Sequence, residues 1–117
     1  MNERFLSKAK KSANGKWVTG YYFHDFDNNI ECMNYQVPGN YLAETKIELS
    51  TLCQCTGLKD KNGVLIFEGD ELDINGEARQ IMYIDGGYGY TYYGWINLYS
   101  KAHLGIVDIE VIGNIHD

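Results

Sequence analysis

Carboxylates cluster in the middle of the chain, where Glu68, Asp70, Glu71 and Asp73 fall within six residues. Carboxylate oxygens bind divalent cations, and neighbouring carboxylates support acid–base catalysis. The same pattern also fits a turn followed by a strand, because Glu71 and Asp73 alternate with apolar residues as a solvent face does. No second acidic or basic cluster lies near it in the chain. The sequence therefore leaves open whether this cluster binds a cation.

Cysteine and histidine side chains are the other residues that bind metals. Zinc sites usually contain a ligand pair separated by roughly two to four residues, whereas only one residue separates Cys53 from Cys55. An odd number of cysteines with no export signal favours free thiols over disulfides. We predict reduced thiols that pack as small hydrophobic side chains, and no metal or other cofactor. The residues considered for zinc are Cys32, Cys53, Cys55, His24, His103 and His116.

A calcium loop beginning at Asp25 fails at two positions. Asp25, Asp27 and Asn29 match its first three ligand positions, but Ile30 replaces the required glycine and Gln36 replaces the final glutamate. The chain also has no Ser-His-Asp arrangement, no phosphate-binding glycine–lysine motif and no nucleotide fingerprint. We therefore expect a protein that is not an enzyme.

Aromatic residues dominate the segment from Tyr88 to Tyr99, which we interpret as one extended strand. Exposed rings on a sheet stack bases or anchor a protein partner, whereas buried rings fill a core. The alternation predicts one buried face with Tyr88, Tyr90, Tyr92, Ile96 and Leu98. The other face, with Tyr93, Trp95, Asn97 and Tyr99, should be more exposed, and we take Tyr93, Trp95 and Tyr99 as the candidate interaction surface.

The 117 residues suffice for one domain, and 44% hydrophobic content is typical of a folded protein. The net charge of −6 argues against bulk attraction to nucleic acid or anionic lipid. Without a long apolar segment or a signal peptide, the protein should be cytoplasmic and not bind membranes. Residues 1–16 alone carry a charge of +4. We expect these basic residues to protect an exposed strand edge, with contact to an acidic partner as the alternative.

Turn signals divide the chain into short strands. Asp60 and Gly63 fit the ends of a type I turn, and the reversal at Gly69 before Asp70 requires a positive φ. Asn-Gly pairs at 14–15 and 75–76 predict two hairpins. The expected strands cover residues 17–23, 30–37, 64–67, 71–74, 78–84, 88–99 and 107–112, while 41–49 fits either a helical turn or a strand. The fold class is mainly β, as a small, strongly bent antiparallel barrel.

Three segments resemble the YopX-type proteins of phages and prophages. They are Arg4-Phe5 with residues 14–22, the run from Gln54 to Asp70, and the closing segment 110–115. The resemblance implies one β-rich domain over residues 1–117, with an N-terminal hairpin layer (1–50) and a C-terminal part (51–117) similar to an SH3-like barrel. The family's function is unassigned. Cys53 and Cys55 depart from its pattern, which usually has a glycine and an aromatic residue there.

Two classes of function follow. The first is a phage accessory protein that contacts a host or phage protein, or a second copy of itself, through the aromatic face or the basic N-terminal hairpin. The second is a nucleic-acid-associated module, because small barrels present aromatic sheets to single strands. Only Arg79 and Lys101 flank the aromatic segment, and a nucleic-acid groove needs more positive charge than that. We therefore favour the first class.

Overall fold

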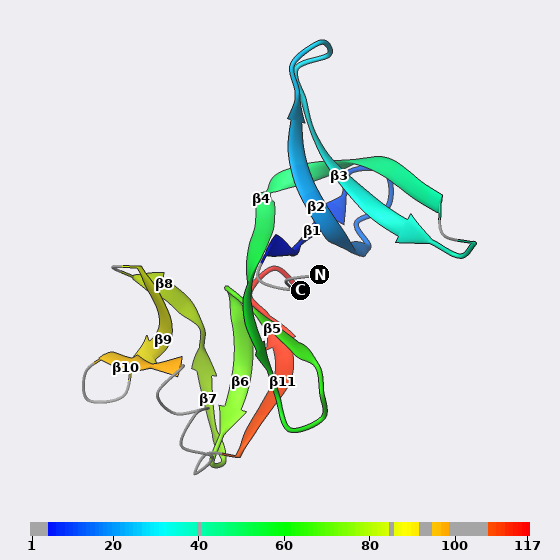
Figure 1. Cartoon of the computed structure of the whole chain (residues 1–117). Coiled ribbons are helices and arrows are strands. Elements are labelled where there is room, and N and C mark those ends of the chain that lie inside the picture. The colour runs from blue at the N-terminus through cyan, green and yellow to red at the C-terminus, as the bar shows by residue number, and fades with distance from the viewer. Residues whose placement is uncertain (1–4, 40, 85, 92–94, 99–107) are drawn as a thin grey trace. The chain divides into compact units, whose positions relative to one another are not determined.

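A computed structural model describes residues 5–39, 41–84, 86–91, 95–98 and 108–117 (Figure 1). The described chain is mainly β with antiparallel strand pairing, which confirms the predicted fold class. It divides into two compact units, Met1–Gln54 and Cys55–Asp117. The long strand β4 (Tyr41–Lys59) belongs to both, and it shows that residues 41–49 form a strand rather than a helical turn.

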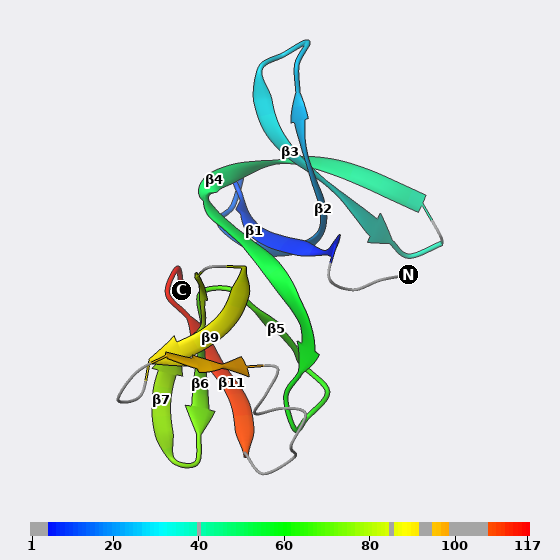
Figure 2. The ribbon, with the colours of Figure 1, turned by 60° about the vertical axis from the view of Figure 1, so that its left-hand side comes forward.

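The N-terminal unit is a partly closed ring of strands, visible in Figure 2. β1 (Ser7–Lys11) pairs with β2 (Trp17–Asp25), β2 pairs with β3 (Ile30–Val37), β3 pairs with β4, and β4 returns to pair with β1. Burial of alternate apolar side chains inside the ring stabilises it. The core consists of Ala9, Val18, Met33 and Ile47, with Tyr35 and Leu52 packed against it.

β1 is not an edge strand, so the predicted edge protection by its lysines is wrong. It pairs with β2 on one side and with β4 on the other, because the ring closes through it. The Nζ atoms of Lys8 and Lys10 instead lie 4.9 and 5.5 Å from the centroid of the Trp17 ring. These two lysines interact with an aromatic face rather than protect a free edge.

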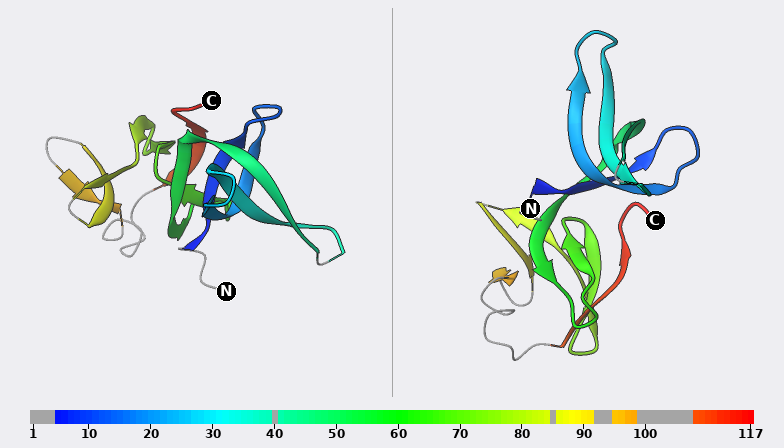
Figure 3. Two further views of the ribbon diagram at one scale, coloured as in Figure 1. Left: turned by 90° about the horizontal axis from the view of Figure 1, so that it is seen from above. Right: turned by 45° about the vertical axis from the view of Figure 1, so that its right-hand side comes forward.

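The C-terminal unit is built from short strands (Figure 3). The last residues of β4 pair with β5, β6 pairs with both β7 and β11, and β9 pairs with both β8 and β10. The strands are β5 (Leu65–Phe67), β6 (Asp70–Ile74), β7 (Glu77–Gln80), β8 (Met82–Ile84), β9 (Gly87–Thr91), β10 (Trp95–Asn97) and β11 (Ile109–Asn114). The core consists of Ile66, Leu72, Ile74, Ile81, Tyr90, Leu98 and Ile109. The SH3-like character of this part stays a prediction.

Both Asn-Gly hairpins are confirmed, but the strand predicted over residues 78–84 is two strands, β7 and β8. The chain breaks at the fully buried Ile81. Its N–H donates to the carbonyl of Asp70 at 2.9 Å, and its carbonyl accepts from the N–H of Gly69 at 2.8 Å. These bonds continue the pairing of β7 with β6 as far as Gly69, and the following strand β8 pairs with β9 instead.

The single aromatic strand predicted over residues 88–99 is also wrong. β9 and β10 are antiparallel partners, with Tyr90 opposite Ile96. Tyr90 and Leu98 are buried in the core and Tyr88 and Ile96 are partly buried, as the buried face predicted, but Asn97 is partly buried as well. Tyr92, Tyr93, Tyr99 and the side chain of Trp95 lie outside the described residues, so the candidate surface placed there stays a prediction.

Candidate interaction surface

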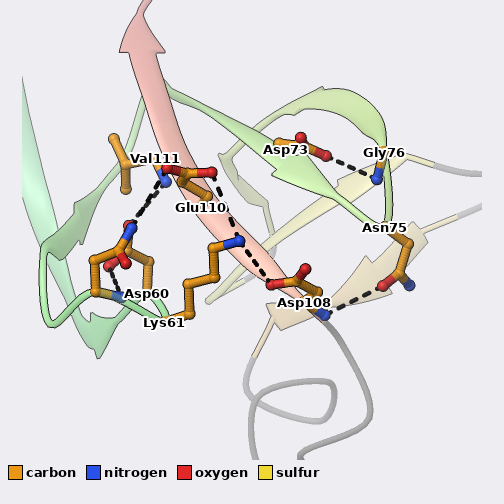
Figure 4. A network of polar contacts seen from close by, with 9 residues as sticks. Asp60, Lys61, Asp73, Asn75, Gly76, Asp108, Glu110 and Val111 are labelled. Carbon is orange, nitrogen blue, oxygen red and sulfur yellow. Dashed lines mark hydrogen bonds and ion pairs between the residues drawn. The ribbon is translucent and has the colours of Figure 1, made fainter.

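The turn at Asp60 confirms the first part of the predicted turn motif. Asp60 Oδ1 accepts hydrogen bonds from the N–H groups of Asn62 at 2.8 Å and Val64 at 2.9 Å. The backbone carbonyl of Asp60 accepts a hydrogen bond from the N–H of Gly63 at 3.0 Å. Its second oxygen, Oδ2, accepts the N–H of Val111 in β11 at 2.9 Å (Figure 4). Burial raises the pKa of this carboxyl, but the three N–H donors outweigh burial and hold the pKa below its ordinary value. Asp60 thus joins a local turn to a distant strand.

Gly69 and Asp70 form the second part of this motif. Gly69 has φ +85°, as predicted, and its carbonyl accepts the N–H of Ile115 at 3.0 Å. Asp70 is fully buried, and its carboxylate accepts the N–H of Phe67 at 2.8 Å and the side-chain amide of Asn114 at 2.9 Å. The central run and the closing segment that carried the family resemblance therefore contact each other, and their role here is structural.

The acidic cluster 68–73 does not converge on one point. Asp70 faces inward with Leu72 and Ile74, whereas Glu71 and Asp73 alternate with them and face the other side of β6. Asp73 accepts the N–H of Gly76 at 2.8 Å and closes the β6–β7 turn. In the part of the chain that the structure describes, no group of three or more His, Cys, Asp or Glu side chains could hold a metal ion. All three cysteines are free and buried, which confirms that part of the prediction.

A second polar network surrounds Lys61 (Figure 4). Lys61 Nζ lies 3.2 Å from Asp108 and 3.7 Å from Glu110, and hydrogen bonding to Asp108 is the first cause of its raised pKa. The N–H of Asp108 donates to Asn75 Oδ1 at 3.2 Å. Exposed ion pairs of this kind contribute little to stability. These contacts connect the start of β11 to the turn that contains Lys61 and to the turn at Asn75. The carboxylates of Asp108 and Glu110 both pair with Lys61.

Three aromatic side chains of the N-terminal unit follow one face of β2 into the turn at its end. Tyr22 and His24 have one residue between them in β2, so their side chains lie on the same side of the strand, and the ring of Phe26 contacts that of His24. We call these three residues the aromatic stripe. Phe26, just beyond the end of β2, is 86% exposed and Tyr22 is 39% exposed. The stripe continues the face that carries the buried Val18, at the point where β2 extends beyond the core.

Glu31 holds the aromatic stripe together from the neighbouring strand. It is the cross-strand partner of His24, and its Oε1 accepts the hydroxyl of Tyr22 at 2.7 Å and lies 2.7 Å from His24 Nδ1. An ionised carboxylate only accepts, so His24 Nδ1 carries the hydrogen in this pair. The hydrogen bond from His24, followed by the one from Tyr22, lowers the pKa of Glu31. The bond between Tyr22 and Glu31 also raises the pKa of Tyr22. His24 in turn contacts Phe26 edge to face, with ring centroids 4.6 Å apart.

The turn that carries Phe26 is built on Asp25. Its Oδ1 accepts the N–H of Asp27 at 3.0 Å and of Asn28 at 3.2 Å, and its Oδ2 accepts the side-chain amide of Asn28 at 3.0 Å. Asn29 closes the turn with φ +55°, a conformation that asparagine tolerates better than most residues. The carboxylate of Asp25 thus shapes the turn, which explains without calcium why acidic residues alternate here.

The sequence pattern did not predict this surface. Residues 17–23 were expected only to form a strand, and the aromatic binding face was expected at residues 93–99. The available signal was the alternation of aromatic rings at 22, 24 and 26, which continues through Asp25 into the turn. His24 with Glu31 has the geometry of a general base and its orienting carboxylate. Among the described residues, the side chains that contact His24 are those of Glu31 and Phe26, and neither is a serine or cysteine nucleophile.

The comparisons with known proteins concern the whole chain. A family model described as YopX protein matches residues 5–117. The chain belongs to the YopX family. The match covers both units and confirms the resemblance found in the sequence. No curated protein and no solved structure matches this YopX family member significantly. Among the described residues, no helix is both long and apolar enough to span a membrane.

Proposed function

We propose that this YopX family member is a phage- or prophage-encoded, non-catalytic accessory protein that binds another protein in the cytoplasm of a bacterial host. The observation that carries the proposal is the exposed aromatic stripe on a structured hairpin. Large aromatic side chains dominate the binding energy of protein interfaces. Phe26 presents such a ring to solvent on a turn that three hydrogen bonds from Asp27 and Asn28 to Asp25 already order.

The construction of the hairpin supports binding. β2 pairs with β1 only over residues 17–20 and with β3 over Tyr21–Asp25, and β3 pairs with β4 from Cys32 onward, so the end of the hairpin beyond Cys32 is two-stranded. A two-stranded hairpin is marginally stable in water, and local bonds such as those of Asp25 and Glu31 stabilise it. A surface ordered before binding loses less conformational entropy when the partner arrives. The stripe is therefore suited to dock as a preformed unit.

A nucleic-acid-associated module is the second candidate, and the lysines of β1 favour it. Lys8 and Lys10 lie against Trp17, and Lys11 Nζ lies 4.9 Å from the ring centroid of Tyr35. Basic and aromatic side chains together are typical of single-strand binding surfaces. Titration with a mixed-sequence single-stranded oligonucleotide separates the two functions. Binding that falls steeply with salt supports the module, and its absence supports the first proposal.

The experiment for the first proposal compares protein capture by three forms of the purified full chain. Phe26→Ser removes the exposed ring, whereas Ile112→Ser makes a matched change at a 54% exposed position of the other unit. We expect wild type and Ile112→Ser to retain the same bacterial protein, and Phe26→Ser to retain it about tenfold more weakly, as for an interface hot spot. Equal capture by all three forms, or no specific capture, refutes the proposal.

A further inference from the structure

We infer that the aromatic stripe and the carboxylates around it recognise an arginine- or lysine-bearing segment of the partner protein. This inference rests on the proposed function and adds the chemistry of the partner. It depends on two features of the hairpin, the sign of its charge and the position of its rings.

The β2–β3 hairpin itself carries carboxylates and neither lysine nor arginine, and Lys46 on the neighbouring strand β4 offsets part of this negative charge. Residues 17–45 contain four carboxylates and neither lysine nor arginine, although the N-terminal unit as a whole has as many basic as acidic residues. The same charges act on Cys32 on β3. Burial raises the pKa of its thiol first, the charges of Asp25, Glu44 and Glu31 raise it further, and the charge of Lys46 lowers it. A cationic segment is attracted to this surface, whereas an acidic protein or a nucleic acid is repelled.

The rings and the carboxylate of Glu31 are placed to bind one cationic side chain. A guanidinium or ammonium group is attracted to the face of an exposed ring, and arginine stacks there most often. Tyr22 and His24 both bond to Oε1 of Glu31, and none of the bonds recorded for the described residues uses Oε2. The Glu31 side chain is 24% exposed, so solvent reaches the group. An arginine lying on the stripe can thus donate to Glu31 while its plane covers a ring.

The test uses an array of synthetic peptides of equal length, in which each arginine is replaced in parallel by glutamine and by glutamate. We expect the wild-type chain to bind arginine-containing peptides, and binding to fall with the glutamine series, with the glutamate series and with added salt. Phe26→Ser should abolish binding. Asp27→Lys changes an exposed carboxylate whose side chain accepts none of the turn bonds, and should weaken binding about three- to tenfold.

Glu71→Lys is the matched control, because it makes the same charge change at an exposed position of the other unit. It should bind the peptides as wild type does, and unchanged circular dichroism should show that each variant is folded. Equal binding to the arginine, glutamine and glutamate series, equal effects of Asp27→Lys and Glu71→Lys, or no binding to any peptide overturns the inference. If lysate capture still depends on Phe26 in that case, the proposed function stands and only the partner chemistry is wrong.

Discussion

Replacing Asp60 by asparagine tests the bond between the central turn and β11. Asp60 is 8% exposed and accepts three N–H groups through two carboxylate oxygens. An asparagine in its best orientation keeps its oxygen on Asn62 and Val64, so its NH₂ group faces the N–H of Val111. The hydrogen bond from the N–H of Val111 to the charged carboxylate is lost, and this N–H then faces another donor, the NH₂ group of the asparagine. We expect the free energy of unfolding to fall by about 1.5–3 kcal/mol.

The assay is urea unfolding followed by circular dichroism, with amide exchange at Val111 as the local measure. Asp73→Asn is the matched control, because Asp73 accepts one exposed N–H, from Gly76, which an amide oxygen also accepts. The control should lose less than about 0.5 kcal/mol. Equal losses in the two variants, or unchanged exchange at Val111 in Asp60→Asn, would refute the reasoning.

The difference between wild type and Asp60→Asn should also depend on pH. The folded pKa of Asp60 lies below its ordinary value of 3.8. A depressed pKa stabilises the folded state above the unfolded pKa, and this contribution is lost as pH falls through the folded pKa. The difference in unfolding free energy should therefore be constant near neutral pH and shrink below about pH 4. A difference that grows as pH falls contradicts this assignment.

Three further changes test the fold and the thiols. Gly20→Ala would place a Cβ 2.0 Å from the backbone oxygen of Asn34, so we expect a loss of about 3 kcal/mol or more in urea unfolding, and a loss below about 0.5 kcal/mol would show that the strands separate freely. Gly69→Val forces a β-branched residue to φ +85°, which should cost about 2 kcal/mol or more and lower the melting temperature; an unchanged melting temperature would remove the argument. Cys53→Ala combined with Cys55→Val should leave the circular dichroism spectrum unchanged, and stoichiometric zinc in protein purified without chelator would overturn the metal-free interpretation.

The sequence was sufficient where a local rule determines the backbone. The Asn-Gly turns, the Asp60 turn and the positive φ of Gly69 each depend on residues close together in the chain, and all are confirmed. Long-range pairing was not predictable in this way. Ring closure through β1 pairs residues such as Ser7 and Gln54, and no local signal records that contact. The break at Ile81 likewise depends on long-range pairing, because β7 pairs with β6 and β8 pairs with β9.

The aromatic stripe could not be predicted from the sequence for a related reason. Sequence alternation indicates which side chains share a face, but it does not show where a strand extends beyond its core. Val18 and Tyr22 lie on the same side of β2, yet Val18 is buried and Tyr22 is 39% exposed. The difference arises because Val18 packs in the core with Ala9, Met33 and Ile47, whereas Tyr22 is not part of that core. Exposure of Phe26 follows from this geometry rather than from any property of the residue itself.

The most direct test of protein binding through the aromatic stripe is site-specific photo-cross-linking in bacterial cells that express the chain. A photoreactive phenylalanine analogue replaces Phe26 in one sample and the exposed Ile112 of the other unit in a second. We predict a discrete adduct with another protein from position 26 and none from position 112. No adduct from position 26, or the same adducts from both positions, would contradict the account.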